Sequence, residues 1–220
     1  LLLIWGIPYQ IFPVIALCCN IIVVSGNCFN YIRAGNINIR LLTPYLTSSI
    51  PLAFIGGSLS IEKDVFEILL FIVLTLAGIL LLLKFQSFDE TKKNYKKIPK
   101  IISFLIGGII GFISGVVGIG GGIFLSPVLL LIKAGQAKHI ATTASLFILI
   151  NSIAGVAGQF TKDFILIEIV NYWLLFLIVF LGGQLGNFLN LKILPGRILV
   201  LITSALVIFV ATRMGFKLFV

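Results

Sequence analysis

Long apolar runs, separated by short polar segments, make up most of this 220-residue chain. A helix needs about 20 apolar residues to cross the hydrocarbon core of a bilayer, so the pattern predicts an all-α integral membrane protein. We expect about seven transmembrane helices after a truncated first span at Leu1–Ile7. Their expected ranges are Ile11–Asn30, Leu41–Leu59, Val65–Phe85, the broken span Ile101–Ile132, His139–Gln159, Val170–Leu191 and Arg197–Thr212.

The start of the chain differs from a signal peptide. Leu1 lies inside an apolar run, with no positively charged segment before it and no cleavage site after it. We therefore expect that the chain begins inside a longer membrane protein.

The composition supports a membrane location: 60% of the residues are hydrophobic and 10% are charged, whereas about a quarter of a soluble domain is charged. Many of the basic residues behind the net charge of +9 lie in the polar linker Gln86–Lys100 and its flank. That placement is typical of a cytoplasmic loop and argues against nucleic-acid binding. With this linker inside, alternating spans put eleven basic residues inside, including Lys162, and five outside, including Lys133 and Lys138.

Potential metal ligands are few. Cys18, Cys19 and Cys28 lie in or at the end of one apolar segment without a CxxC spacing, and His139 is the only histidine. Such a set supports neither a disulfide framework nor a zinc site. We therefore expect no metal and no cofactor.

The two halves of the chain resemble each other. A shift of 129 residues, with a three-residue gap before the last pair, aligns Gly6 with Gly135, Ile11 with Ile140, Gly26 with Gly155, Tyr31 with Phe160, Arg33 with Lys162 and Gly56-Gly57 with Gly182-Gly183. We expect duplicated four-helix repeats: 1–85, which lacks its N-terminal glycine-rich helix, and 101–220, joined by the linker 86–100. An even number of spans per repeat predicts that both repeats have the same orientation.

Glycines between 107 and 122 fall into two groups. Gly107, Gly111 and Gly115 recur every four residues, a spacing that lets two helices approach closely, and Gly182 and Gly186 repeat it later. We expect both sets to be packing seams. The run Gly118-Ile119-Gly120-Gly121-Gly122 differs, because each glycine weakens a helix by about 1 kcal/mol relative to alanine. It predicts a break in the helix, with Pro127 on its far side.

A broken helix in a membrane is a candidate binding site. Its opened backbone must face protein or a wet cavity, and the N-terminus of the following half-helix directs N–H groups and a positive dipole end at one spot. We expect an anion there, bound by Gly118, Gly120, Gly121 and Gly122. Hydroxyls and amides of the next helix are candidates to complete the site: Thr142, Thr143, Ser145, Asn151 and Ser152. The alternatives are a structural kink for the glycines, and hydrogen bonds between helices or back to the same helix for the polar side chains.

Catalytic groups are sparse. Acidic residues are absent from clear mid-membrane positions, and Asp163 and Glu168 fall in a loop. Ser114 stands in Gly111-Phe112-Ile113-Ser114-Gly115, which is the wrong spacing for a rhomboid-type protease, and His139 is the only available base. The sequence therefore predicts that the protein is not an enzyme.

The segment from Gly115 to Gly155 resembles the signature of the TauE/SafE sulfite-exporter family of membrane permeases. The matching features are the glycine core at 118–122, Pro127, the Ala141-Thr142-Thr143 segment with Ser145-Leu146, and the spacing of Ser152 and Gly155. The similarity extends over the whole chain, since Tyr31–Gly35 resembles the corresponding loop of the first half. The first half departs from the pattern at Cys18-Cys19-Asn20, where a Thr-Ser pair is absent.

The resemblance implies a multi-pass secondary transporter of the cell inner (plasma) membrane. Its substrates would be small sulfur-containing anions, such as sulfite or organosulfonates. The expected partners are this anionic substrate and the lipid bilayer, while the oligomeric state stays open. Two alternatives remain: a non-transporting membrane scaffold or subunit, and a carrier of a different small solute, such as a cation held by backbone carbonyls.

Overall fold

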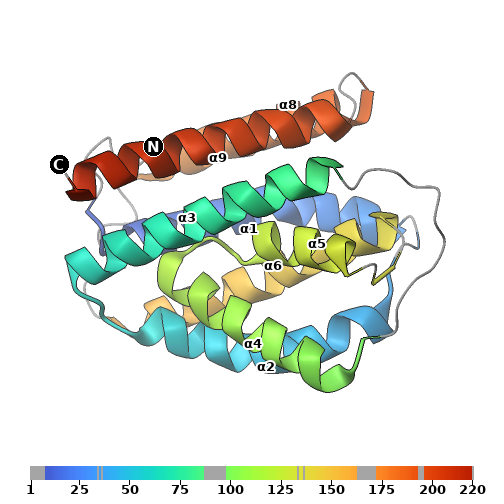
Figure 1. Ribbon diagram of the computed structural model, residues 1–220, viewed down its shortest axis with the longest axis horizontal. Coiled ribbons are helices and arrows are strands. Elements are labelled where there is room, and N and C mark those ends of the chain that lie inside the picture. The colour runs from blue at the N-terminus through green and yellow to red at the C-terminus, as the bar shows by residue number, and fades with distance from the viewer. Residues whose placement is uncertain are drawn as a thin grey trace.

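The computed structural model describes residues 8–33, 35, 37–86, 98–132, 134–135, 137–162, 172–192 and 196–219. In these ranges the chain is a bundle of helices (Figure 1). The helices are α1 (Phe12–Arg33), α2 (Ile39–Ser58), α3 (Lys63–Gln86), α4 (Lys100–Val117), α5 (Gly122–Leu131), α6 (Ala137–Gln159), α8 (Trp173–Lys192) and α9 (Gly196–Phe219).

The all-helical prediction is confirmed, and each predicted range has a helix. The first span, Leu1–Ile7, and the start of the predicted helix Val170–Leu191 lie outside the described residues. Four described segments are long and apolar enough to cross a membrane: Phe12–Arg33, Lys63–Leu82, Lys100–Val117 and His139–Gln159. The count of about seven spans therefore stays a prediction, as does the division of the chain into domains.

The predicted broken span Ile101–Ile132 is wrong in one respect: it does not cross the bundle once. Helix α4 has 18 residues and is about 27 Å long, which is nearly the thickness of the hydrocarbon core. The chain then reverses, and the 10-residue helix α5 runs back (Figure 1). The glycine run is therefore the turn of a helical hairpin, and we call residues 118–121 the glycine turn.

Close contacts fix the direction of each helix. Helices α2 and α4 run in parallel, because Gly107 and Gly115 of α4 meet Tyr45 and Ala53 of α2. Helix α6 runs in the same direction, since Ile140 near its start shares a core cluster with Leu42, and Lys162 after its end donates to Leu59 after α2. One cavity is lined by the start of α1, the α2–α3 connection, the end of α4 and the end of α6. We call this end of the bundle the Lys162 end and the opposite one the linker end.

The helices that the 129-residue shift pairs run in opposite directions, so the predicted shared orientation is wrong for them, while the division into repeats stays a prediction. Helix α1 starts at the Lys162 end, whereas α6, its counterpart under the 129-residue shift, ends there. The two pack against each other with Leu17 near Gly155. Helices α3 and α9 are antiparallel too, since Gly78 meets Ile208 and Gly215 meets Phe71. The hairpin explains the inversion, because it adds one reversal that the count of spans omitted.

The charges follow the corrected topology. The connections at the linker end, with the helix termini beside them, contain twelve of the sixteen basic residues in the sequence. These are Arg33, Arg40, Lys84, Lys92, Lys93, Lys96, Lys97, Lys100, Lys133, Lys138, Lys192 and Arg197. The predicted placement of Lys162 on the linker side, and of Lys138 on the other side, is wrong, and Lys133 lies outside the described residues. Under the positive-inside rule, this excess of twelve basic residues over the remaining four predicts that the linker end is cytoplasmic.

The seam on α4 is confirmed. A Cβ at Gly111 would lie 2.6 Å from the Cα of Ser49, and Cβ atoms at Gly107 and Gly115 would overlap the backbone carbonyls of Tyr45 and Ala53. The predicted seam on α8 is wrong for the part of the chain that the structure describes. A Cβ at Gly182 or Gly186 would meet nothing within 4 Å.

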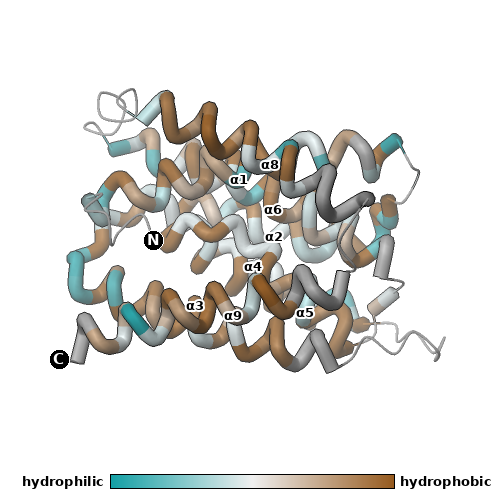
Figure 2. The backbone as a smooth tube through the Cα atoms, turned by 90° about the horizontal axis from the view of Figure 1, so that it is seen from above, coloured by the Kyte–Doolittle hydropathy of each residue, from teal (hydrophilic) through white to brown (hydrophobic). Residues whose placement is uncertain are grey.

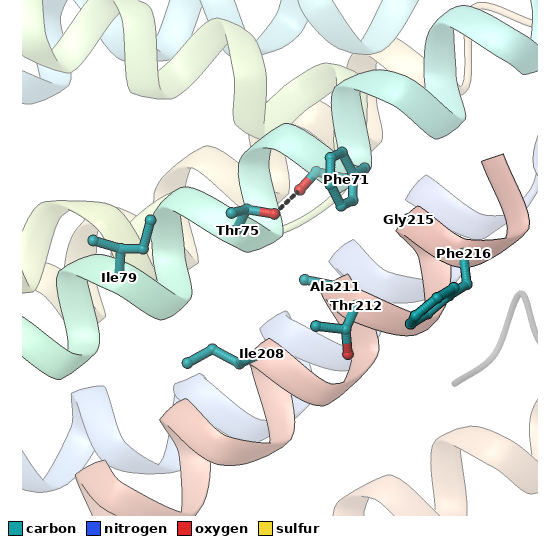
Figure 3. Close-up of a pocket in the computed structure, with 8 residues that line it drawn as sticks. All are labelled: Phe71, Thr75, Ile79, Ile208, Ala211, Thr212, Gly215 and Phe216. Carbon is teal, nitrogen blue, oxygen red and sulfur yellow. Dashed lines mark hydrogen bonds between the residues drawn. The ribbon is translucent and has the colours of Figure 1, made fainter. Parts of the chain in front are cut away.

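The outer surface of the bundle is apolar. Figure 2 shows hydrophobic residues along most of each helix and hydrophilic ones concentrated at the two ends. An apolar groove of about 480 Å³ lies between α3 and α9 (Figure 3). Its lining consists of Phe71, Thr75, Ile79, Ile208, Ala211, Thr212, Gly215 and Phe216. The hydroxyl of Thr75 donates to the carbonyl of Phe71 at 2.8 Å, so this lining suits contact with lipid chains.

Candidate functional site

The glycine turn requires glycine at three positions. Gly118 caps α4 with φ 83°, and its N–H donates to the carbonyl of Ser114 at 2.9 Å. Gly120 has φ 76°, and Gly121, the residue before α5, has φ 73°. L-residues pay about 1–2 kcal/mol in this left-handed region. The chain therefore reverses between two helices in four residues, which leaves the N-terminus of α5 inside the bundle.

Three helices close around the turn. Gly118 abuts the backbone of Pro13 in α1. A Cβ at Gly120 would lie 2.8 Å from Asn20 Nδ2, 2.9 Å from Ile148 Cγ2 and 3.1 Å from Ser152 Oγ. A Cβ at Gly121 would lie 2.8 Å from Ile110 Cγ2, 2.9 Å from Phe147 Cε1 and 3.4 Å from Ser114 Cβ. The glycines are therefore required for packing as well as for φ, and the turn is occluded in this conformation.

The turn extends from Gly118, which contacts Pro13 near the start of α1, to Gly120, which lies deeper in the bundle beside Asn20 and Ser152. Asn20 comes eight residues after the start of α1, and Ser152 comes seven residues before the end of α6. At 1.5 Å per residue, both are about 10–12 Å from the Lys162 end. In a hydrocarbon core of about 30 Å, this is the depth at which transporters hold their substrates.

Unpartnered polar atoms gather near the turn. Ser114 Oγ and Ser152 Oγ are buried without a hydrogen-bond partner, and each belongs to a residue beside the glycines. An unsatisfied buried polar group costs about 1–3 kcal/mol. Asn20 Nδ2 donates to the Gly118 carbonyl at only 3.5 Å, the limit of a hydrogen bond. Three polar side chains from α1, α4 and α6 thus surround the turn with capacity to bind something else.

The predicted site residues separate into two sets. The structure brings Ser152 to the glycine turn and makes Gly122 the first residue of α5, beside Ile148. Thr142, Thr143 and Ser145 lie on α6 closer to the linker end, and none of them is among the atoms nearest to the glycines.

The remaining α6 side chains differ in their bonding. Thr142 is buried and partnered, Thr143 Oγ1 is buried and unpartnered, and Ser145 is half-buried. Asn151 donates from Nδ2 to the carbonyl of Phe147 at 2.9 Å, while its Oδ1 has no partner. The alternative prediction, a hydrogen bond back to the same helix, is therefore confirmed for Asn151 Nδ2 but not for Asn151 Oδ1.

Sequence reasoning missed Asn20 and Ser114 as members of this set. Asn20 was visible only as a departure from the threonine-serine pattern of the other half, and Ser114 was considered only as a nucleophile. The available signal was simpler, because a polar side chain inside an apolar span is costly and usually functional. The sequence does not show that Asn20 lies near Gly120 and Ser114 near Gly121, because both contacts depend on the hairpin.

The site presents neutral hydrogen-bonding groups. Its donors are the first-turn N–H groups of α5, the Asn20 amide and two hydroxyls, and its walls are Ile110, Phe147 and Ile148. No group of three or more His, Cys, Asp and Glu side chains that could hold a metal ion occurs among the described residues. Such a site can bind a small polar or anionic solute through N–H and O–H groups and the positive end of a helix.

Comparison with known proteins places the chain among membrane transporters. The model of the sulfite exporter TauE/SafE family matches residues 1–214. The chain is 29% identical to the probable membrane transporter protein y4hK of Sinorhizobium fredii, over 90% of this chain and 80% of that protein. It is 25% identical to the probable membrane transporter protein MJ0441 of Methanocaldococcus jannaschii, over 81% and 69% of the respective chains. No solved structure matches.

The match covers helices α1 to α8 and most of α9, with the glycine turn and the polar residues around it. It also agrees with apolar helices long enough to cross a bilayer several times. The chain is a multi-pass membrane protein and belongs to the TauE/SafE sulfite-exporter family of membrane transporters.

Proposed function

We propose that the protein is a secondary transporter of small sulfur-containing anions, such as sulfite or organosulfonates, in the cell inner membrane. The anion binds at the glycine turn. Backbone N–H groups of Gly121 and Gly122 at the start of α5 face it, and Asn20, Ser114 and Ser152 complete its shell. Membership of a family described as sulfite exporters supports the substrate class.

One observation carries the binding site. The N-terminus of α5 is buried at mid-bundle depth, and the unpartnered hydroxyls of Ser114 and Ser152 lie next to it. A sulfite or sulfonate group has three oxygens that accept hydrogen bonds, and it carries the negative charge that a helix N-terminus stabilises by about 0.3–1 kcal/mol or more when partly buried. The bound anion would satisfy these hydroxyls.

Thr142, Thr143, Ser145 and Asn151, the other polar residues that the sequence predicts for the site, also have a role in this proposal. Thr142, Thr143 and Ser145 precede Phe147 on α6 and lie toward the linker end, whereas Asn151 follows Phe147 by one turn and is next to Ser152. Thr143 Oγ1 and Asn151 Oδ1 are buried without partners. We assign Thr142, Thr143 and Ser145 to the route between the glycine turn and the linker end, where their hydroxyls pass a polar solute through apolar helices, and Asn151 to the level of Ser152 at the turn.

The antiparallel repeats suggest how the site changes access. In transporters with inverted repeats, the substrate binds between the repeats at mid-membrane, and one repeat rocks against the other. Here α1 and α6 pack antiparallel, and the glycine turn lies against both. A small rotation between these helices would expose the turn first to one end of the bundle and then to the other.

Sulfite flux in proteoliposomes tests the proposal with two variants. Gly121→Leu places a side chain against Ile110 and Phe147, and we expect flux to fall to background. Gly120→Ala adds one methyl group between Asn20 and Ser152, and we expect flux to fall at least about tenfold because the left-handed φ costs about 1–2 kcal/mol and the donors are displaced. Gly182→Ala is the matched control, since its Cβ meets nothing within 4 Å.

Two results would contradict the proposal. Undiminished sulfite flux in folded Gly121→Leu protein would remove the glycine turn from the pathway. Absence of sulfite flux in the unaltered protein, with flux of another solute that depends on Gly121, would keep the site and replace the substrate.

A further inference from the structure

A polar cavity lies at the Lys162 end, next to the glycine turn. Its volume is about 300 Å³. It is lined by Tyr9, Gln10, Pro13, Leu59, Ser60, Ile61, Phe66, Val116, Gln159 and Lys162. Pro13 also contacts Gly118, and Val116 precedes it by two residues. The cavity therefore reaches the wall of the candidate site from outside the bundle.

Lys162 is the cation of this lining. Its ammonium donates to the carbonyl of Leu59 at 2.8 Å and to Gln159 Oε1 at 2.9 Å. Gln159 is buried and donates in turn from Nε2 to the carbonyl of Gly115 at 3.3 Å. Two of the three ammonium protons thus have neutral acceptors, and the third has no acceptor among the residues that the structure describes.

The charge of Lys162 is half-buried beside neutral oxygens. Burial lowers the pKa of Lys162 below its ordinary value, which means that the surroundings do not fully compensate the positive charge. Glu62 lies in the α2–α3 connection and Asp64 in the first turn of α3, but both are exposed and neither lines the cavity. An anion that entered the cavity would supply the missing negative charge.

We propose that this cavity is an entry vestibule in which Lys162 binds the anion before it reaches the glycine turn. The inference rests on the proposed function. The donors of the vestibule are the Lys162 ammonium, the Tyr9 hydroxyl, the Gln10 amide and the Ser60 hydroxyl, all at the mouth of a route that ends at Gly118. The vestibule concentrates anions at the less basic end of the bundle, because twelve of the sixteen basic residues belong to the linker end.

The first test is transport kinetics with sulfite in proteoliposomes. Lys162→Gln removes one charge-assisted hydrogen bond, which is worth about 1.5–3 kcal/mol, so the apparent KM should rise about tenfold or more while the maximal rate changes less than about twofold. Lys162→Arg should keep the low KM. Lys63→Gln is the control, since Lys63 is exposed at the same end and does not line the cavity. A reduced maximal rate with unchanged KM would make Lys162 a structural cap for α2 and overturn the vestibule.

The second test separates the vestibule from the deeper site. An impermeant amine-reactive reagent modifies purified protein, and peptide mass spectrometry measures the rates at Lys162 and Lys63. Sulfite at ten times its dissociation constant should slow modification of Lys162 about tenfold and leave Lys63 unchanged. The protection should persist in Gly121→Leu protein, which cannot transport. Equal rates with and without sulfite would overturn the vestibule, whereas protection without any flux would leave it standing and refute only the transport of sulfite.

Discussion

The two glycine groups on either side of Val117 use the same residue for different physical purposes. Gly107, Gly111 and Gly115 have helical backbones, and their nearest neighbours are mostly backbone and Cβ atoms of α2. Gly118, Gly120 and Gly121 have φ between 73° and 83° and reverse the chain. Two of these three, Gly120 and Gly121, lie among side chains, including the polar Asn20, Ser114 and Ser152.

This difference separates stability from function along a single stretch. In the seam, a backbone atom of the neighbouring helix cannot move away from an added methyl group, so substitutions disrupt the packing of α4 on α2. In the turn, side chains can move at small cost, but the polar atoms that would bind a ligand move with them. Seam variants should therefore lose the fold, and turn variants should lose transport.

The largest expected effect concerns the direction of the chain through the turn, and it is all-or-none. Ala134 follows α5, and Ser60 lies between α2 and α3. Single Ala134→Cys and Ser60→Cys variants are made in a background where Cys18, Cys19 and Cys28 are serine. Ser60→Cys should react with an impermeant maleimide in intact cells, and Ala134→Cys only after the cells are permeabilised. The hairpin puts Ala134 at the basic, cytoplasmic end. Labelling of both cysteines from the same side would restore the single broken span and remove the inverted repeats.

The next largest effect tests the seam. Gly115→Val would place a side chain against the carbonyl of Ala53 and the amide nitrogen of Gly57, 2.8 Å from the Cβ position. Overpacking of this kind costs about 1–3 kcal/mol, so we expect a lower unfolding temperature in detergent and less monodisperse protein. Gly182→Val is the matched control on α8 and should change stability by less than about 0.5 kcal/mol. Equal destabilisation by both changes would show that α8 is packed by chain outside the described residues.

Much of the fold could be predicted from apolar runs, because the thickness of the bilayer sets the length of a spanning helix and a run of glycines ends one. The boundaries of α2 and α4 follow the predicted ranges within a few residues. The hairpin could not be predicted in the same way. A glycine run signals that a helix stops, but the direction of the next helix depends on how α5 packs against α6, through contacts such as Gly122 with Ile148.

The candidate site was predicted in part for the same reason. Gly118–Gly122 and Ser152 could be assigned to one site from the sequence, because Ser152 lies on the helix that follows the glycine run and both belong to the family signature. It could not bring in Asn20, which is 98 residues from Gly118, nor separate Ser152 from Thr142 and Thr143. Which hydroxyl faces the turn is decided by the rotation of α6, and periodicity within an apolar helix fixes that rotation poorly.

The smallest expected effect separates the turn from ordinary buried polar residues. Ser152→Ala removes a buried hydroxyl that has no partner, so stability should stay equal or rise by about 1 kcal/mol, while the apparent KM for sulfite rises about fivefold to tenfold through loss of one hydrogen bond of about 1 kcal/mol or more. Ser204→Ala is the control, because Ser204 is equally buried on α9 but donates to the carbonyl of Leu201 at 2.9 Å. It should lower stability by about 1 kcal/mol or less and leave KM unchanged. If the Ser152 hydroxyl binds the ligand, Ser152→Ala weakens transport without lowering stability, whereas Ser204→Ala lowers stability without changing transport. A Ser152→Ala protein with lower stability and normal KM would instead place Ser152 in the packing of α6, as Gly115 is in the packing of α4.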